Sequence, residues 1–133
     1  METWKESQLK QLTFAKSVDT AYPILLRFAE NLGFNFCAVT VAMPQQVTSI
    51  NTLQINNYPE EWNRQYEQRK FSSIDPITAH CNQSMMPIVW NETLYEKAPH
   101  VWQALQEQGL QHGWSQSFHH KESGLCSILS LAR

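Results

Sequence analysis

The sequence predicts an α+β fold, an α/β/α sandwich around a central antiparallel sheet of five strands. Along the 133 residues, segments with helical spacing are mixed with short segments in which apolar residues recur at every second position. The last two of these strand-like segments are separated by only a short polar stretch. That spacing favours antiparallel pairing, because parallel strands need a longer crossover.

The first half of the chain predicts two helices followed by two strands. Residues 4–14 form a first helix with few apolar positions. The second helix lies between a polar cap that begins at Ser17 and a stop at Gly33, and Pro23 is expected in its first turn, where a missing N–H costs little. The apolar period then drops to two over residues 34–43, and a further strand is expected at residues 50–56.

The middle of the chain contains two helix starts. Pro59 is predicted at the first position of a helix, with Glu60 and Glu61 in the positively polarised first turn. Asp75 is expected to cap a short helix that runs to about Cys81. A strand at residues 85–90, a helix from Asn91 or Thr93 to Gly109, and strands at 113–118 and 125–132 complete the prediction.

Composition and charge argue against several classes of protein. The net charge is −2 and the basic residues form no stripe, so we do not expect this chain to bind nucleic acid by itself. No apolar run approaches the roughly 18 residues that a membrane span needs. The first residues carry Lys5, Glu6 and Lys10 and lack the apolar region of a signal peptide. We therefore expect a cytoplasmic protein.

The cysteines predict neither a disulfide framework nor a metal site. Cys37, Cys81 and Cys126 are odd in number, lie far apart and form no CxxC pair. We interpret them as reduced, partly buried thiols, and we expect no metal and no cofactor.

Polar and aromatic side chains gather between residues 58 and 75. Trp62 and Tyr66 are four residues apart and leave the same face of a helix, while Tyr58 lies at the helix start. Asp75 follows as an acceptor, and an indole N–H can only donate. These groups suit a ligand with a carbonyl, an amide and an aliphatic tail. From spacing alone, a Trp/Tyr pair in an ordinary core beside a capping aspartate is the more common arrangement.

A set of motifs extends this pattern over most of the chain. From about Leu25 to Arg133, the order and spacing resemble the autoinducer-binding domain of LuxR-type quorum-sensing regulators. The segments that carry the resemblance are Asn57-Tyr58-Pro59-Glu60-Glu61-Trp62 with Tyr66, Ile74-Asp75-Pro76, Pro87-Ile88-Val89-Trp90, His112-Gly113-Trp114-Ser115 and Leu129-Ser130-Leu131-Ala132-Arg133.

The resemblance implies a domain that encloses an N-acyl-homoserine lactone, and it implies roles for particular residues. Trp62 would donate its indole N–H to the lactone carbonyl, and Asp75 would accept the amide N–H of the ligand. Tyr58 and Ser130 would contact the acyl carbonyl. The remaining site residues would be Tyr66 along the acyl chain and head, Trp90 and Trp102 against the lactone ring, and Leu110 nearby. Gly113 would serve close packing rather than contact with the ligand.

The resemblance also bears on domain organisation. Residues 1–133 would be an autoinducer-binding domain that is incomplete at its C-terminus, since two more helices and a helix-turn-helix domain normally follow in the family. This chain should therefore not bind an operator directly. Its expected partners are the small-molecule autoinducer and a second regulator chain, in a homodimer or a heterodimer.

Two other functions stay open at this level. The first is a lactone hydrolase that uses His112, His119 or His120 with Cys126 or Ser127, although no nucleophile elbow or paired base is visible. The second is a truncated regulator that has lost its ligand and acts as a dimerisation or dominant-negative partner.

Overall fold

The computed structural model describes residues 18–42, 52–119 and 126–133. Its centre is a five-stranded sheet in the order β2-β1-β5-β4-β3, with every neighbouring pair antiparallel. The strands are β1 (Phe36–Ala42), β2 (Thr52–Asn56), β3 (Ile88–Val89), β4 (Gly113–His119) and β5 (Cys126–Ala132). The predicted five-stranded antiparallel sheet is confirmed.

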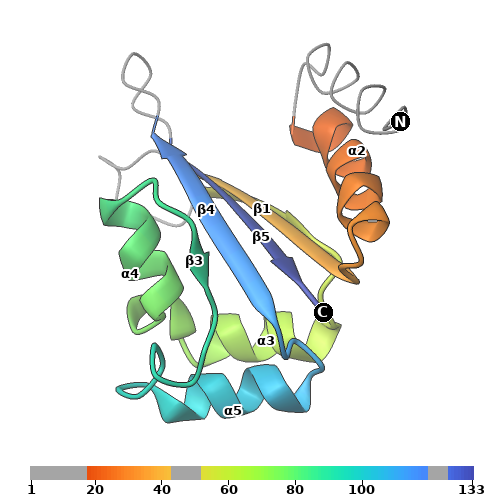
Figure 1. Cartoon of the computed structure of the whole chain (residues 1–133). Coiled ribbons are helices and arrows are strands. Elements are labelled where there is room, and N and C mark those ends of the chain that lie inside the picture. The colour runs from red at the N-terminus through yellow and green to blue at the C-terminus, as the bar shows by residue number, and fades with distance from the viewer. Residues whose placement is uncertain (1–17, 43–51, 120–125) are drawn as a thin grey trace.

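Helices lie on both sides of this sheet (Figure 1). They are α2 (Val18–Asn31), α3 (Glu60–Gln68), α4 (Pro76–Gln83) and α5 (Pro99–Glu107), with a short 3-10 turn η2 (Phe71–Ser73). Helix α2 packs on one side, against β1 and β2, while α3, α4 and α5 lie on the other. The chain is therefore an α/β/α sandwich, as predicted.

The register of the sheet separates two cores. Ser115 faces Ser130 across β4 and β5, so both side chains point to the side of α3, α4 and α5. Their neighbours Trp114 and Leu131 face each other in the same register and point to α2. The α2 side is apolar, whereas the three-helix side carries buried serines and most of the aromatic side chains. Any polar ligand would find its partners on the three-helix side.

Several predicted boundaries were wrong. Helix α2 extends back to at least Val18, so Pro23 lies inside it rather than in its first turn. Its apolar face still packs on the sheet, which outweighs one lost backbone hydrogen bond. Pro59 is the residue before α3 rather than its first residue. Helix α5 begins at Pro99, because the Asn91 side chain accepts the Leu94 N–H at 2.8 Å and holds a turn there.

The strand predicted at residues 85–90 is shorter than expected. Only Ile88 and Val89 pair with β4. The preceding carbonyls are occupied by side chains, since Gln116 Nε2 donates to the carbonyl of Met85 at 3.0 Å and His80 Nε2 contacts that of Met86 at 2.8 Å. Pro87 has no N–H to offer. The helix predicted at residues 4–14 and most of the turn at 119–124 lie outside the described residues.

Candidate ligand-binding site

The core on the three-helix side contains most of the predicted site. Six of the eight predicted residues lie in one cluster: Tyr58, Trp62, Tyr66, Trp90, Trp102 and Leu110. The other two, Asp75 and Ser130, join it through hydrogen bonds. The structure therefore brings all eight residues together, although they come from four different parts of the chain.

Helix α3 positions Trp62 and Tyr66 on its inner face. Their ring centroids are 5.6 Å apart, and Phe71 packs on Trp62 at 5.8 Å. Trp62 is only 4% exposed, yet its indole N–H has no hydrogen-bond partner among the described residues. Within that part of the chain, the only fully enclosed side-chain polar atom without a partner is Gln106 Nε2. The Trp62 N–H must therefore reach accessible space.

Asp75 both caps a helix and accepts from the site. Its Oδ1 accepts the Ile77 N–H at 2.9 Å, as predicted for the cap of α4. Its Oδ2 accepts the Tyr66 hydroxyl at 2.7 Å and that of Thr78 at 3.4 Å. Burial raises the pKa of the Asp75 carboxyl, and the hydrogen bond from Tyr66 opposes that shift. Thr78 was missed by the sequence analysis, because a threonine within a helix turn carries no pocket signal.

Three phenols surround this carboxylate. Burial raises the pKa of Tyr58, Tyr66 and Tyr95, and the negative charge of Asp75 adds to each shift. All three therefore remain protonated hydrogen-bond donors. Tyr95 belongs to the same cluster and was missed by the sequence analysis, since it fell within a predicted helix without a site signal. It lies instead in the turn before α5, with its ring 5.3 Å from that of Trp102.

Trp90 fits against a glycine. A Cβ built on Gly113 would lie 2.1 Å from Cδ2 and Cε3 of the Trp90 indole, so no side chain is tolerated there. The expectation that Gly113 serves close packing is confirmed. The Trp90 N–H donates to the Ser115 hydroxyl at 2.9 Å, and the Ser115 and Ser130 oxygens are 2.6 Å apart. An interaction with Ser130 in turn lowers the pKa of Tyr58 slightly against the larger effect of burial.

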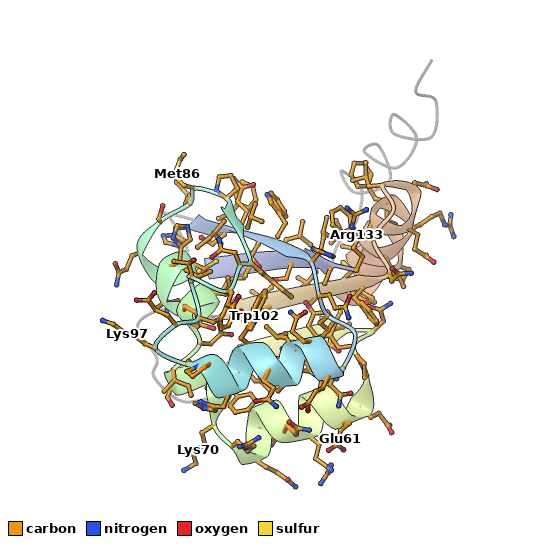
Figure 2. The ribbon with its side chains drawn as sticks, turned by 60° about the horizontal axis from the view of Figure 1, so that its bottom comes forward. Glu61, Lys70, Met86, Lys97, Trp102 and Arg133 are labelled. Carbon is orange, nitrogen blue, oxygen red and sulfur yellow. The ribbon has the colours of Figure 1, made fainter. Side chains whose placement is uncertain are left out.

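The last two predicted residues form the base of the cluster. Trp102 is half-buried on the side of α5 that faces the sheet (Figure 2), and Leu110 is completely buried after α5. By contrast, Glu61 and Lys70 point outward near α3 in the same view. The inner faces of α3 and α5 therefore bring apolar side chains next to the polar groups of Asp75 and Ser130.

The alternative nucleophilic arrangement has no hydrogen bond between a histidine and Cys126 or Ser127 in the described part of the chain. His119 is paired with Cys126 across β4 and β5, but its Nε2 contacts the Cys81 carbonyl at 2.7 Å, and His112 lies at the opposite end of β4. Burial raises the pKa of the Cys126 thiol, which keeps it protonated and weakly nucleophilic. All three cysteines are free and buried. His120 lies outside the described residues.

Comparison with known proteins identifies the family of this domain. The family model described as the autoinducer-binding domain matches residues 17–133. The chain belongs to this family. The matched family is the autoinducer-binding domain of LuxR-family quorum-sensing regulators, which is a domain of transcription factors rather than of enzymes.

Relatives agree in sequence and in fold. The transcriptional activator AnoR of Acinetobacter nosocomialis is 32% identical over 137 residues, which cover 100% of this chain and 56% of that protein. The crystal structure of CepR2 from Burkholderia cenocepacia, an N-acylhomoserine lactone-dependent LuxR-family factor, superposes with a TM-score of 0.84 at 24% identity, over 98% of this chain and 76% of that one. SdiA in complex with octanoyl-rac-glycerol gives 0.83 at 25% identity, over 98% and 53%.

This autoinducer-binding domain spans about half the length of the curated relatives it matches. Across residues 18–42, 52–119 and 126–133, no helix has the length and apolarity that a membrane crossing needs.

Proposed function

We propose that this domain binds an N-acyl-homoserine lactone between the sheet and helices α3, α4 and α5. The observation that carries the proposal is the Trp62 indole N–H, which lies in the buried cluster, has no protein partner among the described residues and reaches accessible space. Once a ligand fills this space, the donor would be cut off from water, and a buried donor without a partner costs about 1–3 kcal/mol. A lactone carbonyl would satisfy this donor.

The other polar groups match the remaining polar atoms of such a ligand. The Asp75 carboxylate would accept the amide N–H, alongside its bond from Tyr66. Tyr58 and Ser130, which interact with each other, would donate to the acyl carbonyl. The donor-and-acceptor pattern of the cluster is therefore the complement of an acylated lactone.

We infer a hollow at this position from the burial and the exposure of three side chains. Tyr58, Tyr66 and Asp75 each keep partial accessible surface, while burial is the main cause of each raised pKa. Side chains that border an enclosed space show this combination, since protein atoms surround them on every side but one. Tyr58 precedes α3, Tyr66 lies within α3 and Asp75 caps α4, and we infer that the ligand head lies between them.

The apolar residues would hold the rest of the ligand. Trp90 and Trp102 would pack on the lactone ring, with Leu110 behind them and Tyr66 along the start of the acyl chain. Each buried methylene of the tail contributes roughly 0.8 kcal/mol. Chain length should then set affinity, while Trp62 and Asp75 set the identity of the head group.

We further propose that occupancy of this site controls transcription in quorum sensing. Support comes from relatives that are named transcriptional activators. The regulator would act in the cytoplasm, where its target DNA lies, as a homodimer or as a heterodimer with a related regulator. We propose no direct DNA contact for residues 1–133.

Thermal melting with a ligand series tests the proposal. N-acyl-homoserine lactones of increasing chain length should raise the melting temperature progressively, whereas the ring-opened acids should raise it little. Octanoyl glycerol is the comparison compound, because it has an acyl chain but no amide. Mass spectrometry of the recovered ligand should show an intact lactone, since ring opening would indicate a hydrolase.

Trp62→Phe tests the donor specifically. It keeps an aromatic side chain but removes the N–H, so we expect weaker lactone binding by about 1–3 kcal/mol. Trp114→Phe, on the α2 side of the sheet, is the matched control and should leave binding unchanged. If no lactone shifts the melting temperature of the unmodified domain, the ligand-free dimerisation partner becomes the better explanation.

A further inference from the structure

We infer that Ser115 is a positioning residue that fixes the Ser130 hydroxyl as a hydrogen-bond donor toward the ligand. This inference rests on the proposed function. Ser115 is completely buried on β4, directly opposite Ser130 on β5. None of the ligand roles proposed above involves it, and its hydroxyl meets Trp90 on one side and Ser130 on the other.

The direction of these hydrogen bonds follows from the chemistry of the groups. An indole N–H can only donate, so the Ser115 oxygen accepts from Trp90 at 2.9 Å. The single proton of Ser115 then needs an acceptor. Among the described residues, Ser130 is the only other side chain or backbone group that the Ser115 hydroxyl contacts, at 2.6 Å. Because a buried unpaired hydroxyl proton is unfavourable, Ser115 donates to Ser130.

The same reasoning continues to the site. The Ser130 oxygen accepts from Ser115, so its own proton is free to point away from the sheet. On that side the Ser130 hydroxyl interacts with the Tyr58 phenol, so the two hydroxyls lie next to each other. The chain of hydrogen bonds therefore runs from the Trp90 N–H through Ser115 to Ser130. It ends at the hydroxyls of Ser130 and Tyr58, next to the proposed ligand position.

A neighbouring serine shows that this arrangement is specific. Ser117 is also completely buried on β4 and points to the same side of the sheet. Its hydroxyl donates to the carbonyls of Cys81 at 2.9 Å and Ser84 at 2.8 Å, so its proton is used by the backbone. Only Ser115 connects the strand to the site, which gives Ser117 the role of a matched control.

This polarity determines which ligand atom can occupy the place beside Ser130. A fixed O–H donor favours a carbonyl oxygen at this place and disfavours an N–H or another donor. The amide of an acyl lactone would thus be oriented in one direction only, with its oxygen toward Ser130 and its N–H toward Asp75. Ser115 sets this orientation without touching the ligand.

Discrimination between an amide and a thioamide tests the inference. The dissociation constants of an N-acyl-homoserine lactone and of its thioamide analogue, whose sulfur is a weaker acceptor, give an affinity ratio for each variant. Ser115→Ala should reduce the preference for the amide about threefold to tenfold, the range expected for one hydrogen bond. Ser130→Ala should reduce it similarly, and the double variant should show no further loss.

The controls separate the possible outcomes. Ser117→Ala should lower stability but leave the ratio unchanged. Trp90→Phe removes the donor that sets the direction, so it should lower the ratio even if Ser115→Ala fails to fold. A ratio in Ser115→Ala or Trp90→Phe equal to that of Ser117→Ala, with the unmodified domain still binding lactone, overturns the inference alone. Failure of the unmodified domain to bind any lactone overturns the proposed function as well.

Discussion

Replacement of Gly113 by alanine should damage both the fold and the site. The added Cβ would lie 2.1 Å from two carbons of the Trp90 ring, whereas carbon atoms in contact are normally about 3.5–4.0 Å apart. The indole must therefore move by more than about 1 Å. Overpacking of this kind costs about 1–3 kcal/mol. Loss of the 2.9 Å hydrogen bond from Trp90 to Ser115 adds about 1–3 kcal/mol.

We therefore expect Gly113→Ala to lower the free energy of unfolding by about 2–6 kcal/mol, measured by urea denaturation. Gly109→Ala is the control, because Gly109 has a φ of +82° with open space around it. Backbone strain alone should cost that variant about 1–2 kcal/mol. The reasoning is refuted if Gly113→Ala costs no more than Gly109→Ala. It is also refuted if Gly113→Ala is equally damaging when Trp90 has already been replaced by alanine.

Three other results are expected. Asp75→Asn keeps a side chain that can cap α4 but loses the carboxylate, so lactone binding should weaken by more than about 1 kcal/mol. An unchanged ligand-induced shift of the melting temperature would contradict the assignment. The folded-state pKa of Asp75 is raised, so the folded protein binds this proton more tightly than the unfolded chain does. The free energy of unfolding, relative to that of Asp75→Asn, should therefore fall as the pH rises from about 4 through the raised pKa. Denaturation curves at several pH values measure this slope, and the opposite slope would exclude the assignment. Lys70 has a φ of 52°, so Lys70→Gly should raise the unfolding free energy by roughly 0.5 kcal/mol, and a destabilised variant would show that the Lys70 side chain matters more than its backbone.

The sequence predicted the sheet well because its signals are local and regular. The period of two over residues 34–43 predicted β1, on which Cys37 and Val39 are buried. The Asp75 cap was also predictable, since the aspartate precedes Pro76 at a helix start. Boundaries failed where side chains compete for backbone groups, as Gln116 does at the carbonyl of Met85 before β3.

The site was only partly visible in the sequence. Trp62 and Tyr66 were suggested by helical spacing, but spacing cannot distinguish a pocket wall from an ordinary core. Tyr95 was missed because its position depends on a turn that the Asn91 side chain holds. The sequence of this turn resembles that of a helix, so the pattern did not reveal it. Ser115 was missed for another reason, since its significance depends on a cross-strand partner that only the register supplies.

The place of β5 in the sheet has a consequence for biosynthesis. The strand lies between β1 and β4, so the middle of the sheet is completed by the last of the five described strands to be synthesised. Until then, β1 and β4 each expose an unpaired edge, and the pairing of Phe36 with Ala132 must wait for the end of the described chain. The nascent domain thus acquires its central strand in one late step. Premature termination before Cys126 would leave two separate sheet fragments rather than a smaller version of the same fold.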